Sequence, residues 1–134
     1  MPRAAPLRAH AALLVGFSGP ASLAEEDALR TVPDASGVHV VWDSTGRLLY
    51  VGQSTQTRTR LRMHLSGERE ASILHEEIGR RLDRELGRRA GRDEIRAWLE
   101  RCTFAYRLTE HPPALKAQIM DELQPELNEV RSRD

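Results

Sequence analysis

The sequence predicts a single mixed α/β domain in which a small, three-stranded, antiparallel-type sheet is flanked by helices. Three observations lead to this fold class. Two short extended segments follow one another over residues 38–52, a third lies over residues 102–108, and segments with helical periodicity surround them. Three short strands are too few for a doubly wound parallel sheet, and a chain of 134 residues suits one domain.

Residues 1–36 are expected to form an N-terminal helical arm that packs on the domain. A short amphipathic helix is predicted over about residues 5–15, and a turn is predicted at residues 17–20, which contain Gly and Pro. Ser22 and Glu25 have the spacing of a capping box, which predicts the start of a second short helix.

The N-terminal apolar run is also a poor export signal, because His10 interrupts it and Gly16 ends it early. No apolar run approaches the ~18 residues that a membrane span needs. We therefore expect a cytoplasmic protein that has no membrane partner.

The elements of the main domain, residues 37–128, follow from their sequence periods. Residues 38–42 and 48–52 are rich in β-branched and aromatic side chains, and the turn residues between them predict an antiparallel hairpin. Apolar residues then recur at helical spacing, and residues 102–108 alternate as a strand does. The predicted helices span residues 55–66, 69–86, 93–101 and 113–123. Residues 129–134 are a polar tail.

The composition excludes several classes of protein. The 20 basic and 20 acidic residues give a formal net charge of zero, so binding to nucleic acid through overall charge is not expected, whereas a local basic patch is compatible. Cys102 is the only cysteine, which excludes an intrachain disulfide and a zinc site built from cysteines. Lys116 is the only lysine among the basic residues.

A group of polar residues gathers around the predicted hairpin and the helix that follows it. His39 and Tyr50 lie on neighbouring strands, and Arg60 and His64 share a helix face because they are four residues apart. An arginine can bind phosphate through two hydrogen bonds, and a histidine or tyrosine can hold or move a proton. Together these residues suit the binding of a phosphodiester. Taken one by one, they have a simpler explanation: the tyrosine is a core residue of a strand, and the arginines form a solvated helix face.

A second candidate is a basic surface on residues 54–101, which carry 12 arginines against 9 acidic residues. The alternative is an ordinary solvated helix surface, because Glu76 and Glu77 precede arginines by four residues. The arginines expected to follow a phosphate backbone are Arg58, Arg62, Arg80, Arg84 and Arg88.

Residues 37–128 resemble the catalytic domain of the GIY-YIG nuclease family. Gly37-Val38-His39 stands for the Gly-Ile-Tyr motif, and Tyr50-Val51-Gly52 follows after ten residues for Tyr-Ile-Gly. Residues 60–65 resemble the helix that carries the family's arginine, and residues 114–128 resemble its closing helix with a Pro-x-x-Asn ending.

This resemblance implies a three-stranded sheet and the hydrolysis of phosphodiester bonds in nucleic acid, mostly DNA, with one divalent cation such as Mg²⁺. It implies that Tyr50 stands near the attacking water, Arg60 on the phosphate and His64 in an accessory role, with Asn128 supporting the site. We therefore expect an endonuclease. The alternatives are a catalytically inactive nucleic-acid-binding module and a protein–protein adaptor on the same fold.

Two positions depart from the family pattern. His39 replaces the first tyrosine, and an imidazole with its ordinary pKa of ~6.5 is a competent general base. Lys116 stands at the position of the metal-binding glutamate, where an ammonium cannot coordinate Mg²⁺ and repels it. The family resemblance thus predicts a divalent cation, whereas Lys116 at the ligand position argues against one. Lys116 is compatible with an inactive binder, with an ammonium that replaces the metal's charge, or with an incidental exposed residue.

Overall fold

The fold is built on a four-stranded antiparallel sheet, in a computed structural model that describes residues 14–66, 69 and 72–127. The strands are β1 (Ser18–Ser22), β2 (Gly37–Trp42), β3 (Leu48–Ser54) and β4 (Thr103–Leu108), in the order β1-β4-β2-β3. The predicted mixed α/β class, with an antiparallel sheet between helices, is confirmed. The sheet has one strand more than predicted.

The additional strand, β1, replaces the turn that was predicted at residues 17–20. It pairs with β4, with Ala21 opposite Phe104, and its register shifts between Ser18 and Ala21. The edge position of β1 explains how it accommodates proline, because an edge strand needs fewer backbone donors. Gly19 has a φ of +109°, and a Cβ there would lie 2.9 Å from the Phe104 carbonyl oxygen, so this turn-type residue fits the strand.

The N-terminal arm therefore contains a strand as well as a helix. The predicted capping box is wrong, because Ser22 ends β1 and its Oγ donates to the Glu100 carbonyl instead. The helix that follows begins at Glu26 without a side-chain cap. Most of the predicted helix over residues 5–15 lies outside the described residues, and residues 14–16 form a turn.

Helices follow the predicted order in the part of the chain that the structure describes. They are α1 (Glu26–Thr31), α2 (Thr57–Ser66), α3 (Ile73–Leu86), α4 (Arg92–Leu99) and α5 (Pro112–Leu123). The third begins four residues later than predicted because Ser72 is its N-cap and accepts a hydrogen bond from the His75 amide. None of these described helices is long and apolar enough to span a bilayer.

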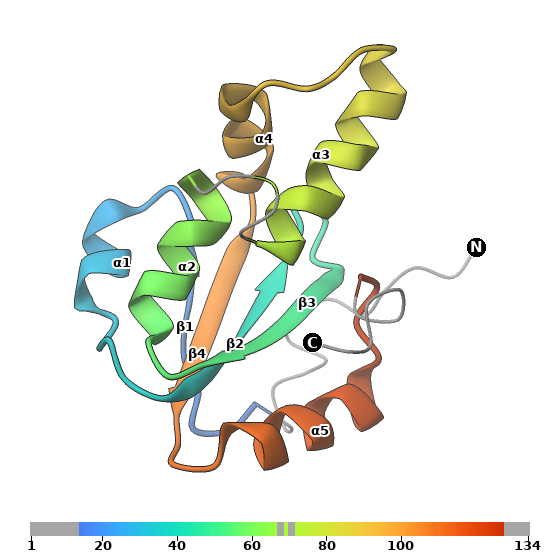
Figure 1. Cartoon of the computed structure of the whole chain (residues 1–134). Coiled ribbons are helices and arrows are strands. Elements are labelled where there is room, and N and C mark those ends of the chain that lie inside the picture. Colours follow the sequence, from blue (N-terminus) through green and yellow to red (C-terminus); the bar gives the residue numbers. More distant parts are fainter. Residues whose placement is uncertain (1–13, 67–68, 70–71, 128–134) are drawn as a thin grey trace.

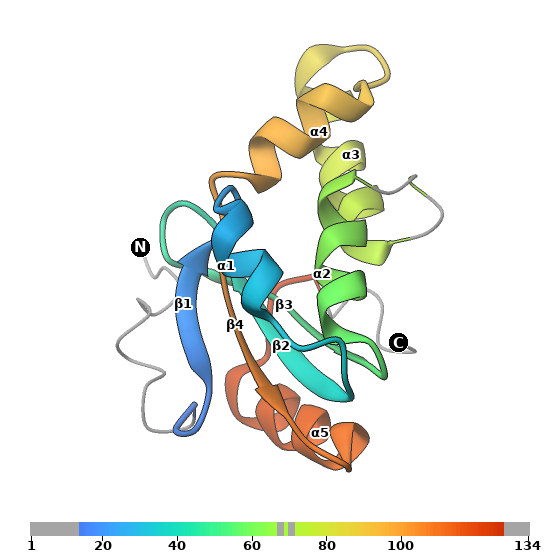
Figure 2. The ribbon, with the colours of Figure 1, turned by 90° about the vertical axis from the view of Figure 1, so that its left-hand side faces the viewer.

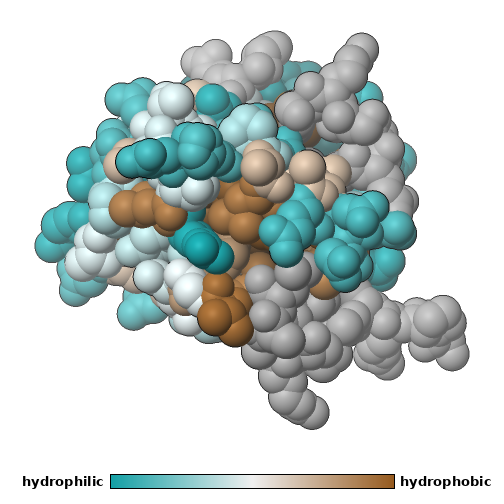
Figure 3. All heavy atoms as spheres, turned by 90° about the horizontal axis from the view of Figure 1, so that it is seen from below, coloured by the Kyte–Doolittle hydropathy of each residue, from teal (hydrophilic) through white to brown (hydrophobic). Residues whose placement is uncertain are grey.

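Each face of the sheet carries its own hydrophobic core. Figures 1 and 2 show α5 on one side of the sheet and the other helices on the opposite side. On one face α5 packs against β2 and β3, with Ile119 near Val40. On the other face the core includes Val41 of β2 and Leu61 of α2, together with residues of α1, α3 and α4. Figure 3 views the molecule from below, where hydrophobic residues gather at the centre and hydrophilic residues surround them. The sheet is thus enclosed between α5 and the group α1–α4.

Candidate functional site

Three aromatic rings meet on the face of the sheet that α2 covers. His39 lies on this face because side chains alternate along β2, where Val38 and Val40 belong to the opposite core. The ring centroid of His39 lies 5.0 Å from that of His64 on α2 and 6.0 Å from that of Tyr50 on β3. The Tyr50 and His64 rings meet edge to face at 5.4 Å. The sequence prediction that these three residues lie together agrees with this geometry.

Gly52 makes room for this cluster. It pairs with His39 in the β2–β3 register, and a Cβ at this position would lie 2.6 Å from two ring atoms of His39 and 2.9 Å from the Tyr50 ring. Real Cβ atoms do not approach other atoms that closely. Gly52 is therefore required by the packing of the two rings beside it, which supplies a physical reason for a glycine two residues after Tyr50.

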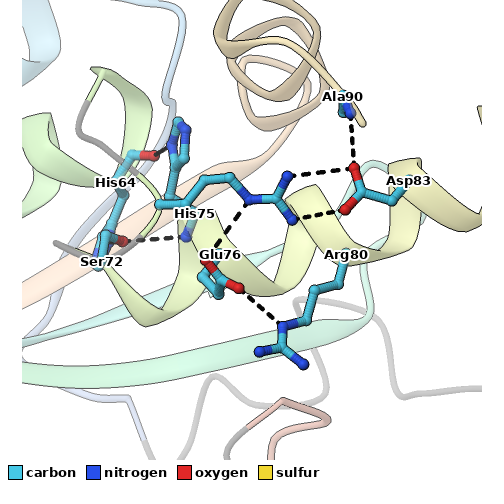
Figure 4. A network of polar contacts seen from close by, with 8 residues as sticks. His64, Ser72, His75, Glu76, Arg80, Asp83 and Ala90 are labelled. Carbon is cyan, nitrogen blue, oxygen red and sulfur yellow. Dashed lines mark hydrogen bonds and ion pairs between the residues drawn. The ribbon is translucent and has the colours of Figure 1, made fainter. Parts of the chain in front are cut away.

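A chain of hydrogen bonds connects the cluster to the start of α3. The two histidines meet through their Nε2 atoms, 2.9 Å apart, and His64 Nδ1 lies 2.7 Å from Ser72 Oγ. The His75 amide donates to Ser72 Oγ at 3.1 Å, and the His75 ring donates from Nδ1 to the His64 carbonyl at 2.7 Å. Figure 4 shows His64, Ser72 and His75 gathered at the first turn of α3. The position of His64 is thus fixed from both its side chain and its backbone.

The donors and acceptors determine the direction of each hydrogen bond in this series. Because Ser72 Oγ already accepts from the His75 amide, we assign its own proton to the bond with His64 Nδ1. A neutral His64 then carries its proton on Nε2 and donates it to His39 Nε2. A neutral His39 must in turn carry its proton on Nδ1. That atom is buried and has no hydrogen-bond partner in the described structure.

Burial keeps both histidines neutral at physiological pH. His39 is 0 % exposed, and desolvation, together with the positive charges of Arg60 and Lys116, lowers its pKa from 6.5 to about 3. Desolvation also lowers the pKa of His64 well below its ordinary value, with further contributions from His39, Arg60 and His75. The expected general base, an imidazole that titrates near neutral pH, is therefore absent from the resting site.

Arg60 brings a positive charge to the cluster that no carboxylate neutralises among the described residues. Its side chain is half-buried on α2, and its guanidinium makes no hydrogen bond or ion pair with another described residue. Arg60 precedes His64 by four residues on α2, which puts the two side chains on one face of the helix, and its charge lowers the pKa of both His39 and His64. An arginine in such a setting is suited to bind an anion such as a phosphate.

Lys116 brings a second positive charge, from α5. Its side chain is 7 % exposed, and its charge also lowers the pKa of His39. The interpretation of Lys116 as an incidental exposed residue is therefore wrong. A buried ammonium loses hydration, and a nearby anion offsets that cost.

The donor set does not fit the divalent cation that the family resemblance implies. The two Nε2 atoms of the histidines face each other in a hydrogen bond, and the position of the metal-binding carboxylate holds an ammonium. Magnesium takes oxygen ligands. Glu126, ten residues after Lys116, has a carboxylate that already pairs with Arg47 and Arg81. No group of three possible metal ligands occurs within residues 14–66, 69 and 72–127. The chemistry of the described cluster suits an anion.

Asn128 lies outside the described residues. The chain just before it is held against β3, because the Glu126 amide donates to the Leu48 carbonyl and the Leu127 amide donates to the Leu49 carbonyl. The last described residue is therefore anchored one residue before Tyr50 in the strand.

The five arginines of the predicted basic surface are not equally available to a phosphate backbone. Arg62 pairs with Glu26 at 2.7 Å, Arg80 with Glu76 at 2.9 Å, and Arg88 with Glu94 at 2.7 Å. The remaining two differ from these: Arg58 donates to the Val32 carbonyl at 3.4 Å, and Arg84 is exposed. The structure thus supports the ordinary solvated surface for three of these positions more than a continuous stripe.

Sequence reasoning missed Ser72 and His75, although one signal for them exists. Ser72 precedes the apolar run of α3 and has the spacing of an N-cap relative to His75, which marks the helix start. It also missed Arg69, which pairs with Asp83 at 2.9 Å and with Glu76 at 3.6 Å, both on α3. Figure 4 shows Asp83 also accepting from the Ala90 amide, which links α3 to the following loop.

Comparison with known proteins adds no family assignment. No protein-family model matches the chain, and no curated protein matches it. The functional argument therefore depends on the residues and their geometry.

Proposed function

We propose that the protein is an endonuclease of the GIY-YIG type that hydrolyses phosphodiester bonds in nucleic acid, with DNA as the expected substrate. The proposal depends on a site in which Arg60 of α2 provides positive charge and hydrogen-bond donors beside Tyr50 and the buried His39 and His64 rings. A phosphodiester carries one negative charge and two unesterified oxygens, which such donors recognise.

The single observation that carries the proposal is the state of Arg60. Other arginines of the helical surface, such as Arg62, Arg80 and Arg88, are neutralised by carboxylates. Arg60 is half-buried beside two neutral rings and has no such partner among the described residues. A positive charge held in this way is stabilised when an anion binds.

Each residue of the cluster has a distinct part in this proposal. Arg60 binds the phosphate, and the buried His39 ring packs behind Tyr50. Tyr50, 6.0 Å from His39 between ring centroids, orients the attacking water. His64 is a positioning residue, because its hydrogen bond to His39 holds the ring that packs near Tyr50.

A second candidate is a nucleic-acid-binding module without catalytic activity. The low basicity of the buried histidines favours it. A general base works best when its pKa lies near the working pH, whereas the pKa of His39 is about 3 in the resting site. The same cations would then bind a phosphate backbone without cutting it. Cleavage separates the two candidates, because both predict binding.

The test is cleavage of supercoiled plasmid DNA by the full chain and by two arginine variants. Arg60→Gln removes the unpaired charge of the site. Arg96→Gln removes one equal charge from the exposed surface of α4, where Arg96 pairs with Glu100, and serves as the matched control. We expect the wild type and Arg96→Gln to cut at similar rates, and Arg60→Gln to lose at least ~10²-fold in rate.

Thermal unfolding of the three proteins checks that the variants remain folded. Equal cleavage by Arg60→Gln and the wild type would remove the site assignment. Salt-dependent DNA binding without cleavage by the wild type would establish the binding module in place of the nuclease.

A further inference from the structure

The chain that follows α5 passes the edge of the sheet formed by β3. In Figure 1 it rises from α5 to the start of β3, where the Glu126 amide donates to the Leu48 carbonyl and the Leu127 amide donates to the Leu49 carbonyl. The Leu127 side chain is buried in the core that contains Leu61 of α2, on the opposite face of the sheet from α5. Backbone hydrogen bonds and apolar packing therefore hold this segment independently of the Glu126 carboxylate.

The Glu126 carboxylate lies between two arginines from different elements of the fold. Arg47, in the turn before β3, places its Nε atom 3.1 Å from Glu126 Oε1, and Arg81 of α3 places a terminal guanidinium nitrogen 2.7 Å from Oε2. Each carboxylate oxygen thus has its own arginine. Two positive charges meet one negative charge here, whereas Arg88 and Glu94 pair one to one.

The three side chains of this ion-pair group are accessible to a ligand in solution. Arg47, Arg81 and Glu126 are 47 %, 26 % and 32 % exposed. The carboxylate of Asp43, in the same turn as Arg47, is engaged within that turn, because its Oδ1 accepts from the Thr45 amide and hydroxyl and from the Arg47 amide. Glu126 is therefore the anion that the two guanidinium groups share.

A phosphodiester is a suitable replacement for this carboxylate. It carries one negative charge that two unesterified oxygens share, and guanidinium groups bind phosphates and carboxylates with the same fork geometry. Ion pairs that are partly exposed contribute little to stability, so one anion can replace another here at small cost. Tyr50 follows Arg47 by three residues, so a phosphate at this place lies near the strand that carries the candidate site.

We propose that Arg47 and Arg81 form a second phosphate-binding site for nucleic acid, which the Glu126 carboxylate occupies until a backbone phosphate displaces it. The inference rests on the proposed function, since it takes nucleic acid as the substrate. It adds a second contact with the backbone, near the start of β3, to the one that Arg60 makes. It also makes Glu126 an autoinhibitory residue that weakens the binding of substrate.

The experiment compares the binding of a labelled DNA duplex by the full wild-type chain, Glu126→Gln and Glu94→Gln over a series of salt concentrations. Glu94→Gln is the matched control, because Glu94 pairs with Arg88 at 2.7 Å and its replacement changes the net charge equally. We expect Glu126→Gln to bind at least about threefold more tightly than the wild type, and Glu94→Gln to stay within about twofold of it. The salt dependence of Glu126→Gln should be steeper by about one released counterion.

Double variants connect this gain to the two arginines. Arg47→Gln or Arg81→Gln, each combined with Glu126→Gln, should cancel the gain in affinity, because the carboxylate then has no intact site to block. Arg96→Gln combined with Glu126→Gln has the same net charge, removes an arginine from the exposed surface of α4 and should keep the gain. Thermal unfolding of each variant checks that it remains folded.

The outcomes separate this inference from the proposed function. If the wild type binds the duplex and Glu126→Gln binds it no better than Glu94→Gln, the inference is overturned and the proposed function stands. A gain that persists without either arginine would overturn the assignment to Arg47 and Arg81. Absence of DNA binding by the wild type and every variant would overturn the proposed function and this inference with it.

A measurement on the wild type alone decides the inference even if a variant unfolds. The Arg47 Nε–H group donates to Glu126, and its signal in a ¹H–¹⁵N NMR spectrum is expected to shift when duplex DNA displaces the carboxylate. A signal that stays in place at saturation with duplex would overturn the inference. A signal that moves with inorganic phosphate but not with duplex would overturn nucleic acid as the ligand.

Discussion

The protein is predicted to lose stability as the pH falls from about 7.5 to about 5, because two histidines are buried in their neutral form. His39 has a pKa of about 3 in the folded protein and an ordinary value of 6.5 when unfolded. Between these values the unfolded chain binds a proton that the folded protein does not. Stability is therefore complete above pH 6.5 and is lost progressively as the pH falls toward 3.

The size of the effect follows from these two values. At about pH 5 the unfolded state gains about 2 kcal/mol from protonation of His39 alone, relative to about pH 7.5. His64 contributes with the same sign, because burial lowers its pKa as well. Four carboxylates have a lowered pKa, and they are Glu26, Asp34, Asp83 and Glu94. They respond mainly below the ordinary values of 3.8 for aspartate and 4.5 for glutamate, so they do not account for a loss above that range.

Urea denaturation at several pH values measures this loss. The wild type is expected to lose at least about 2 kcal/mol in the free energy of unfolding over the interval, and His39→Gln should lose about 2 kcal/mol less than the wild type. The exposed His111 is the matched control, because His111→Gln leaves the buried pair intact and should follow the wild-type curve. A wild type that is equally stable at both pH values, or a His39→Gln variant with the same loss, would refute the burial of neutral histidines.

Two further changes test the packing and the hydrogen bonds around His39 and His64. Gly52→Ala places a Cβ 2.6 Å from the His39 ring and should lower the free energy of unfolding by about 1–3 kcal/mol in urea; an unchanged midpoint would contradict the ring packing. Ser72→Ala removes the α3 cap and the partner of His64 Nδ1, at a cost of about 2 kcal/mol. The matched change Ser66→Ala, at an exposed hydroxyl, should cost less than about 0.5 kcal/mol, so equal losses would refute a special role for Ser72.

Much of the fold could be predicted because its signals are local. The β2–β3 hairpin and the helices α2 to α5 each show their period within their own residues, and the structure has them in that order. The strand β1 was not predictable in this way. It has five residues, contains Gly19 and Pro20, and pairs with β4, which lies some eighty residues further along the chain. A strand at a sheet edge depends on its distant partner more than on its own composition.

The sequence predicted which residues lie together in the candidate site, but it did not predict their burial or protonation state. Spacing indicated His39, Tyr50 and His64, and the structure places their rings together. Their burial depends on how α2 and α5 close over the sheet, and the predicted basicity of His39 failed for that reason. The burial of Lys116 is equally a tertiary property, since the helical pattern of α5 does not distinguish a lysine at the surface from one beneath it.

The measurement that tests the central claim most directly is a single-turnover reaction between excess wild-type protein and a labelled DNA duplex, with binding and cleavage followed in the same samples. The claim that Arg60 and Tyr50, beside the buried His39 and His64 rings, form a site for phosphodiester hydrolysis predicts that bound duplex is converted to shorter fragments. Duplex that stays bound and uncut at saturation would contradict hydrolysis and leave a binding module, and duplex that does not bind would contradict a phosphate site altogether.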